Sequence, residues 1–310
     1  MSSTILFETR AQGKLLLTGE YFVLDGATAL AMPVRFGQTL RVEAGALAHH
    51  IDWRSLDPDG SKWFEARFEL PGLQIRIESD LKTALTLFNI LAACQKLNPE
   101  HFAAPQSYRV VTQNDFPREW GLGTSSTLIA ALARWASVNP YKILFETLGG
   151  SGYDLACAYA EGPILYRLEG QTPIIAPVQF APAYSNQLYF VFLGKKQNSR
   201  DGIARFRERA PKSPELLDKI SRMTQQFLDA RTLEALDAAI LEHELLISET
   251  LLMPRVKGLY FSDFWGEVKS LGAWGGDFVL VTSARSEAET REYFTEKGLT
   301  TILSWKEMVL

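Results

Sequence analysis

The sequence predicts an α+β protein of two domains, and three observations lead to this prediction. The chain has 310 residues, which is more than a single hydrophobic core usually serves. Its first part alternates short apolar runs with glycine turns, a pattern typical of β-hairpins. Its last part separates strands by pairs of helical segments, which is typical of an α+β sandwich. Three prolines between Thr172 and Pro182 mark a change of composition, so we expect domains at residues 1–175 and 176–310.

The N-terminal domain begins with strands between Ile5 and Glu43, in which Asp25-Gly26 is the clearest turn signal. Between Ser79 and Leu97 apolar residues recur at helical spacing, with Ser79 as the expected N-cap. Asn98-Pro99 ends this helix. Residues 107–115 then alternate between apolar and polar side chains, which predicts a strand.

A glycine-bracketed loop opens into an amphipathic helix in the stretch FPREWGLGTSSTLIAAL, residues 116–132. The loop itself comprises Gly121, Leu122, Gly123, Thr124, Ser125 and Ser126. Glycines let the backbone approach a ligand closely, and free amides at a helix start attract an anion. The three hydroxyls add donors for phosphate oxygens and a potential Mg²⁺ ligand. The same pattern also starts many ordinary helices, so the loop alone leaves both interpretations open.

A second informative stretch is GGSGYDLACAYAEGPILYRL, residues 149–168. It combines a glycine-rich approach, Asp154 at the start of an apolar helix, and a strand. Beyond it we expect a strand at 187–194, a basic turn at 195–202, helices between Ser213 and Thr250, a helix around Phe261 to Leu271, and then strand, helix and strand to residue 305.

The composition excludes several classes of function. Hydrophobic residues make up 46% and charged residues 22% of the chain, a composition typical of soluble globular proteins. The net charge of -4 argues against a nucleic-acid partner. The sequence contains no apolar run of membrane-spanning length and no signal-peptide core, so we expect a cytoplasmic protein without a membrane partner. Cys94 and Cys157 lack metal-type spacing and are expected to be reduced core residues.

Phosphoryl transfer needs a backbone cradle and Mg²⁺ for the triphosphate, a cation for developing charge, and a carboxylate for the attacking oxygen. Glycine-rich stretches around Lys14, Thr124 and Gly272, together with Asp154, supply these types of group. The Walker A pattern of P-loop proteins is absent from the sequence.

Four motifs give the sequence a specific resemblance. GKLLLTGEYFVLDG, GLGTSS and GAWGGD, in this order, resemble the three motifs of the GHMP small-molecule kinases, which include galactokinase and the homoserine, mevalonate and phosphomevalonate kinases. GSGYDLACAYAEGPILYR is most similar to the mevalonate-pathway members and to the GYDIA family of bacterial GHMP kinases. The resemblance covers nearly the whole chain. It implies the two-domain GHMP kinase fold, with a ferredoxin-like C-terminal domain, and it implies ATP and Mg²⁺ as cofactors.

The resemblance also implies roles for individual residues. Lys14 matches the lysine beside the attacking hydroxyl, and Asp154 matches the aspartate proposed as catalytic base. Residues Gly121 to Ser126 match the phosphate loop, in which Ser125 is the expected Mg²⁺ ligand. Glu146 is expected as a second Mg²⁺ ligand because family members carry a glutamate on the helix before the aspartate.

Two departures from the motifs concern the acceptor. Tyr21 stands where the first motif usually has histidine, and Trp274 stands in a third motif that is one residue shorter than usual. A tryptophan there predicts a wall of the acceptor pocket or a lid over it. From the first and third motifs we expect substrate contacts at Glu20, Tyr21, Gly272, Ala273, Trp274 and Gly275.

The acceptor is expected to be a small molecule, either mevalonate or phosphomevalonate. A phosphate monoester needs Arg or Lys donors, and Lys196 and Arg200 in the basic turn could supply them. A solvated turn is the alternative. The sequence also leaves open another acceptor such as homoserine or a sugar, a decarboxylase on the same scaffold, and a non-catalytic ligand-binding protein. The oligomeric state is not predicted.

Overall fold

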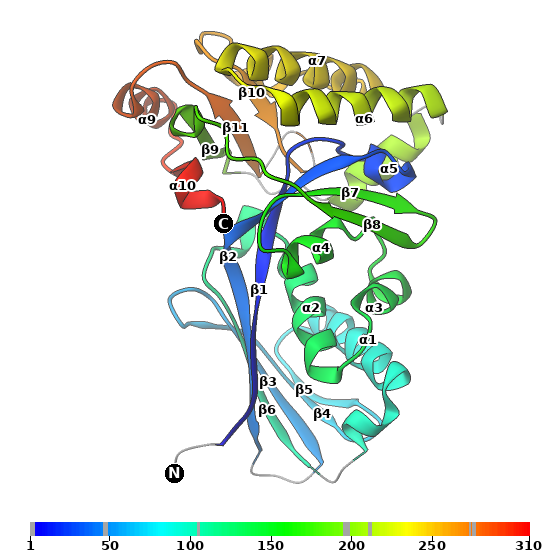
Figure 1. The fold of residues 1–310 in the computed structure, drawn as a ribbon. Coiled ribbons are helices and arrows are strands. Elements are labelled where there is room, and N and C mark those ends of the chain that lie inside the picture. Colours follow the sequence, from blue (N-terminus) through cyan, green and yellow to red (C-terminus); the bar gives the residue numbers. More distant parts are fainter. Residues whose placement is uncertain are drawn as a thin grey trace. The chain divides into compact units, whose positions relative to one another are not determined.

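The structure of this chain is a computed structural model. It describes residues 4–45, 49–103, 106–194, 199–209, 213–272, 274 and 277–310. Strands and helices are mixed along the chain (Figure 1), which confirms the predicted α+β class. The chain divides into two compact units. The first unit comprises Met1–Gly13, Phe36–Arg118 and Leu122–Tyr159, and the second comprises Lys14–Arg35, Glu119–Gly121 and Ala160–Leu310. The expected sequence boundary near residue 175 stays a prediction.

The large mixed sheet has the strand order β5-β4-β3-β6-β2-β7-β8, with β1 paired to β2. Its strands are β1 (Ile5–Leu16), β2 (Ala29–Ala44), β3 (His50–Leu56), β4 (Lys62–Glu69), β5 (Gln74–Glu78), β6 (Tyr108–Asn114), β7 (Ile164–Glu169) and β8 (Thr172–Pro177). β3 and β6 are parallel. The pairs β2–β6, β2–β7, β3–β4, β4–β5 and β7–β8 are antiparallel. β1 and β2 contribute residues to both units.

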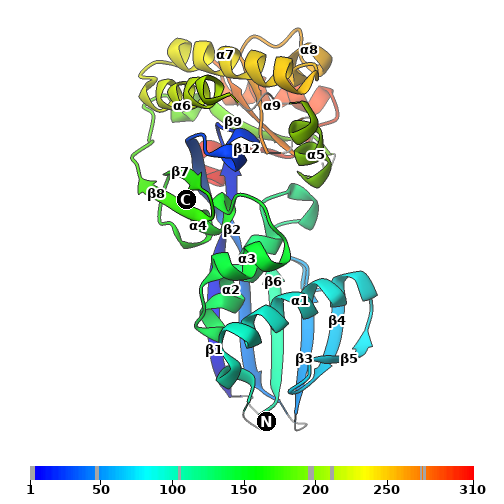
Figure 2. The ribbon, with the colours of Figure 1, turned by 90° about the vertical axis from the view of Figure 1, so that its right-hand side faces the viewer.

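In the first unit helices cover one face of these strands, as Figure 2 shows. They are α1 (Leu81–Leu97), α2 (Thr124–Ala136), α3 (Pro140–Thr147) and α4 (Tyr153–Tyr159), with short 3₁₀ turns at Pro99–Phe102 and Arg118–Trp120. Apolar side chains of helices and strands, among them Trp53, Phe64, Leu91 and Ile129, form one buried core. This core fixes the start of α2 relative to α4, because both helices bury side chains in it.

The second unit holds a separate antiparallel sheet of order β10-β11-β9-β12. Its strands and helices are β9 (Leu188–Phe192), α5 (Ser199–Arg209), α6 (Pro214–Asp229), α7 (Leu233–Leu251), α8 (Val256–Tyr260), β10 (Val268–Ser270), β11 (Phe278–Thr282), α9 (Glu287–Glu296), β12 (Ile302–Ser304) and α10 (Trp305–Met308), preceded by 3₁₀ turns at Phe22–Asp25 and Ser185–Gln187. In chain order the strands lie in the sequence 4-1-3-2, which confirms the expected ferredoxin-like sandwich.

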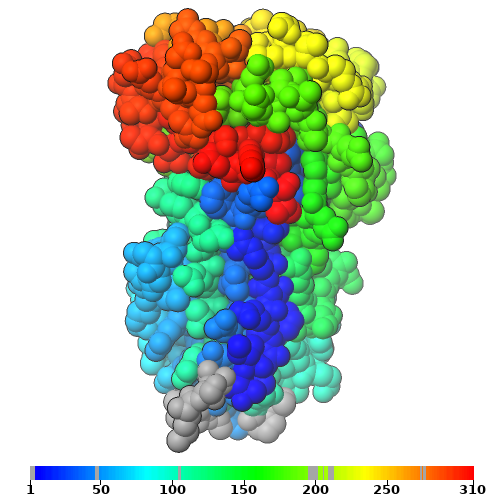
Figure 3. Space-filling view, turned by 60° about the vertical axis from the view of Figure 1, so that its left-hand side comes forward, coloured from blue at the N-terminus to red at the C-terminus, as the bar shows by residue number. Residues whose placement is uncertain are grey.

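Within the second unit, the C-terminus is joined to the first part of β2 by a β-bridge and a hydrogen bond. Val34 bridges to Val309, and the Arg35 guanidinium donates to the Lys306 carbonyl at 2.8 Å. Figure 3 shows the C-terminal residues in red directly against blue residues of the N-terminal part.

Two local predictions are wrong. Asp80, and not Ser79, is the N-cap of α1, because its carboxylate accepts a hydrogen bond from the Thr83 amide at 2.7 Å. No helix spans Phe261 to Leu271. In that range Val268–Ser270 form β10, whose side chains are all buried and whose backbone pairs with β11. Tertiary pairing overrides the local pattern here.

Candidate active site

The predicted phosphate loop leads into α2 as expected. Gly123 is the N-cap, with a φ of +95° in the left-handed region that favours glycine. Because glycine has no side chain, the cap itself leaves the first amides of the helix without a side-chain acceptor. Thr124 is partly exposed and Ser125 is exposed. The start of α2 therefore offers the amides and hydroxyls that fit a phosphate group.

Asp154 lies against this helix start. Its Oδ2 accepts a hydrogen bond from the Ser126 hydroxyl at 2.9 Å, and its Oδ1 accepts one from the Leu155 amide at 3.1 Å. Ser126 also donates toward the Gly123 carbonyl at 3.1 Å. Ser126 is buried, whereas Asp154 keeps part of its surface exposed. The two contacts fix the direction of a carboxylate that remains accessible.

Tyr141 on α3 belongs to the surroundings of Asp154. Burial raises the pKa of the Tyr141 hydroxyl, and the negative charge of Asp154 raises it further. The hydroxyl is buried and has no hydrogen-bond partner among the described residues. The hydroxyl therefore stays neutral, and it lies close enough to Asp154 for the carboxylate charge to raise its pKa.

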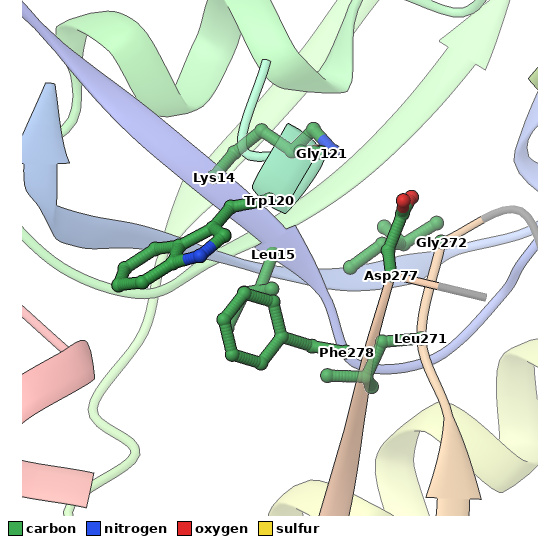
Figure 4. Close-up of a pocket in the computed structure, with 9 residues that line it drawn as sticks. Lys14, Leu15, Trp120, Gly121, Leu271, Gly272, Asp277 and Phe278 are labelled. Carbon is green, nitrogen blue, oxygen red and sulfur yellow. Dashed lines mark hydrogen bonds between the residues drawn. The ribbon is translucent and has the colours of Figure 1, made fainter. Parts of the chain in front are cut away.

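Lys14 lies in the second unit, where its ammonium donates to the Gly121 carbonyl at 2.8 Å. Both residues line a small pocket of about 10 Å³, enough for about one water molecule. Trp120 and Phe278 form its aromatic wall. Their rings meet edge to face, with ring centroids 5.5 Å apart. Gly272 of the third motif lines it as well (Figure 4).

Glu20 is fully buried in a charged cluster within the second unit. Its carboxylate pairs with Lys269 at 2.5 Å and lies 3.3 Å from His243 Nε2. Burial raises the pKa of Glu20, although Lys269 acts in the opposite direction. Burial, followed by the positive charge of Lys269, holds the pKa of His243 well below its usual value, so this imidazole is neutral and accepts from the Gly19 amide at 3.1 Å. Contact of Glu20 with substrate stays a prediction that this burial does not favour.

Tyr21 and Trp274 lie in one apolar cluster of the second unit. Tyr21 stacks on Phe206 of α5 with ring centroids 5.7 Å apart. Trp274 is 1% exposed, and its indole N–H has no hydrogen-bond partner among the described residues. The expected role of Trp274 as a pocket wall or lid is untested, and its burial places it in the interior of the unit.

The expected second metal ligand, Glu146, forms an ion pair with Lys96 at 3.0 Å on the surface of the first unit. Within the described ranges no group of three or more His, Cys, Asp or Glu side chains is placed to hold a metal ion. Mg²⁺ usually binds through one or two protein groups together with substrate phosphates. The exposed hydroxyl of Ser125 is a protein group of this kind. The role of Glu146 stays a prediction.

Several predicted acceptor contacts are outside the described structure. Lys196, Ala273 and Gly275 are not among the described residues. Arg200 belongs to α5, which begins at Ser199. These predictions remain untested.

The structure brings Asp154 together with Ser126 in the first unit, and Lys14 together with Gly121 and Gly272 in the second. Two further residues were not singled out from the sequence. Ser126 was named only as part of the loop, although it is the hydroxyl that holds Asp154. Asp277 ends the quoted motif GAWGGD and lines the Lys14 pocket. The acidic end of a glycine-rich motif was the available signal for Asp277.

No family model and no curated protein sequence matches this chain. Among solved structures it is similar to mevalonate kinase of Methanococcus jannaschii, with a TM-score of 0.71 at 14% identity over 96% of each chain. It is also similar to phosphomevalonate kinase of Streptococcus pneumoniae in complex with phosphomevalonate and AMPPNP, with a TM-score of 0.70 at 16% identity over 96% of this chain and 100% of that one. Lactococcus lactis galactokinase with galactose gives 0.67 at 12% identity over 96% and 92%.

These similarities extend over nearly the whole length of each chain, although sequence identity is low. In the described residues no helix is both long and apolar enough to cross a membrane. The fold expected from the sequence motifs is confirmed: this chain has the fold of the GHMP small-molecule kinases.

Proposed function

We propose that this protein is a GHMP-type kinase that transfers the γ-phosphoryl group of ATP to a small-molecule acceptor of the mevalonate pathway, either mevalonate or phosphomevalonate. The observation that carries the proposal is the Asp154 carboxylate held by Ser126 at the glycine-capped start of α2. The similarity in fold to mevalonate, phosphomevalonate and galactokinase structures supports it.

Asp154 is the proposed catalytic base. In this role it takes the proton of the attacking hydroxyl of mevalonate as the new O–P bond forms and ADP leaves. The attacking phosphate oxygen of phosphomevalonate is already ionised near neutral pH, so with that acceptor the carboxylate orients the acceptor and takes no proton. The hydrogen bonds from Ser126 and from the Leu155 amide fix the orientation of the carboxylate, so little reorganisation is needed on reaction. A positioned base is typically worth about 10²- to 10⁴-fold in rate.

The start of α2 and Lys14 are the proposed phosphate-binding groups. The amides that follow Gly123 and the hydroxyls of Thr124 and Ser125 would bind phosphate oxygens. Lys14 would neutralise charge that develops on the transferred group. Ser125 is the residue that we propose to hold Mg²⁺, which when bound would neutralise charge on the phosphate groups.

The choice between the two acceptors depends on charge. A phosphate monoester adds about two negative charges that need Lys or Arg partners. The basic segment 195–202, in which Arg200 lies at the start of α5, is the proposed source and favours phosphomevalonate. No described side chain supports this choice, so both acceptors belong in the test.

The test is a coupled ADP-release assay with Mg·ATP and mevalonate, phosphomevalonate, homoserine or galactose. We expect turnover with a mevalonate compound. With mevalonate as acceptor, Asp154→Asn should lower kcat by about 10²-fold or more, because the amide cannot accept the proton of the attacking hydroxyl. Asp59→Asn is the matched control, because Asp59 is an exposed acid of the same unit on the β3–β4 turn.

Three outcomes would contradict this proposal. Turnover only with homoserine or galactose would move the protein to another acceptor. CO₂ release from diphosphomevalonate would identify a decarboxylase. Absence of turnover with every acceptor, in protein that still binds ATP, would indicate a ligand-binding protein.

A further inference from the structure

The Asp277 carboxylate occupies the space that the missing side chain of Gly121 leaves. An ideal Cβ on Gly121 would lie 2.5 Å from Asp277 Oδ2 and 2.9 Å from Oδ1, distances at which atoms overlap. Gly121 also has a φ of +68°, a backbone conformation that favours glycine. A side chain at position 121 would therefore displace the carboxylate.

The backbone of Asp277 is itself fixed. Its carbonyl accepts a hydrogen bond from the Leu193 amide at 2.8 Å. The next residue, Phe278, begins β11, a strand with a neighbour on each side. Asp277 has a φ of +53°, which aspartate and asparagine tolerate better than most residues. The sheet therefore holds the backbone of Asp277 in place, and this positions the carboxylate next to Gly121.

Gly121 meets Lys14 through its carbonyl oxygen, which accepts from the ammonium at 2.8 Å. Figure 4 shows the Lys14 ammonium and the Asp277 carboxylate both directed toward Gly121. The ammonium and the carboxylate therefore both lie next to Gly121, and Lys14 and Asp277 line the same small pocket. That residue directly precedes the remainder of the phosphate loop.

We propose that Asp277 is a positioning residue for Lys14. Its carboxylate fixes the Gly121 peptide by packing and attracts the ammonium by charge, so the Lys14 ammonium is placed before substrate binds. This inference rests on the proposed function for its catalytic consequence only. The expected coupling of Asp277 to Lys14 runs through Gly121, which both residues approach, and it can be measured without substrate.

The first test measures stability in a double-mutant cycle. Gly121→Ala should lower Tm in the wild-type chain by roughly 3 °C more than in an Asp277→Gly background, where the overlapping carboxylate is gone. Lys14→Met and Asp277→Asn should likewise be non-additive in Tm. Additive changes in both cycles would overturn the proposal, and these cycles need no turnover.

The second test measures kinetics. Asp277→Asn keeps the shape of the side chain and its tolerance of positive φ, but it removes the charge. We expect kcat to fall about 10- to 100-fold while the KM for ATP changes by less than about twofold, since misplaced reacting groups affect the chemical step. In a Lys14→Ala background Asp277→Asn should have no further effect on kcat.

The control is Asp263→Asn, which removes an exposed acid of the same unit that bonds Tyr293. An unchanged kcat in folded Asp277→Asn protein, or effects of Lys14→Ala and Asp277→Asn that multiply, would overturn the positioning role. If the wild-type protein turns over no acceptor, the proposed function fails. The stability cycles then still decide whether Asp277 and Lys14 are coupled.

Discussion

At the scale of single residues, the buried carboxyl of Glu244 has a raised pKa. It accepts hydrogen bonds from the Ser270 amide and hydroxyl, and it lies 3.7 Å from the Lys269 ammonium. Burial raises the pKa of Glu244 to about 7, despite the attraction of Lys269. Glu244 therefore titrates near neutral pH inside the protein, whereas its usual pKa is 4.5.

A raised pKa in the folded state makes stability depend on pH in a definite direction. Below pH 4.5 the carboxyl is protonated in both states, and its contribution to stability is fully present. As pH rises toward about 7 the unfolded chain ionises first, so the free energy of unfolding falls. Glu244→Gln should remove this loss, because an amide does not ionise.

We therefore expect Glu244→Gln to gain stability relative to wild type between pH 5 and pH 8, by roughly 2 to 3 kcal/mol. Urea unfolding at both pH values measures the difference. Glu20 is present in both proteins and its charge contributes to the raised pKa of Glu244, so the comparison measures the carboxyl of Glu244 together with its interaction with Glu20. Glu242→Gln, an exposed change on the same helix, is the control. An equal stability difference at the two pH values would contradict the prediction.

Residue-level prediction from sequence succeeded where one motif carries the information. The phosphate loop and its helix were predicted from glycine and hydroxyl residues that are adjacent in the chain. The contacts of Ser126 with Asp154 and of Gly121 with Asp277 join residues far apart in sequence. Local spacing holds no information about such pairs, so these contacts were not predicted.

At the scale of elements, the pairing of β10 with β11 depends on a close backbone approach before β10. An ideal Cβ on Gly266 would lie 1.7 Å from the Thr282 carbonyl oxygen. Next to it the Glu267 amide donates to the Thr282 hydroxyl at 2.8 Å, and the Thr282 amide donates to the Glu267 carbonyl at 3.1 Å. No side chain fits between these two backbones.

Gly266→Ala should therefore lower the free energy of unfolding by about 3 kcal/mol, because backbone atoms must separate to accept the methyl group. The control is Gly258→Ala in α8, where an added Cβ meets no atom within 4 Å. It should stabilise the protein by up to about 1 kcal/mol, since alanine favours a helix over glycine. Chemical unfolding of both variants measures this contrast, and equal effects would contradict it.

The same region shows why one element was mispredicted. The segment Val268–Ser270 has a lysine at its centre, which does not indicate an interior strand. Lys269 is nevertheless fully buried, because Glu20, from a distant part of the chain, neutralises it. α1 was predicted within about two residues because periodicity and termination signals are local.

At the scale of the whole molecule, the chain length and the pattern of apolar runs predicted only an α+β class and more than one core. The ferredoxin-like strand order was implied by the motif resemblance, since periodicity does not specify which strands pair. The two compact units are also interleaved in sequence: Lys14–Arg35 and Glu119–Gly121 belong with the C-terminal part. Contacts far apart in the chain define this division, and composition along the chain does not reveal it.

Ligand binding should be visible in the stability of the whole chain. A ligand that binds only the folded state at 100 times its Kd adds about 2.7 kcal/mol to the free energy of unfolding. The chain carries a net charge of -4, so a triphosphate must be held by local donors and by Mg²⁺ rather than by overall charge. We therefore expect Mg·ATP to raise Tm clearly, ATP with EDTA to raise it less, and AMP, which lacks the β- and γ-phosphates, to raise it least. Thermal unfolding with each ligand at equal concentration measures this order. An AMP shift as large as that of Mg·ATP would show that the nucleoside alone accounts for binding, and it would remove the start of α2 as the triphosphate site.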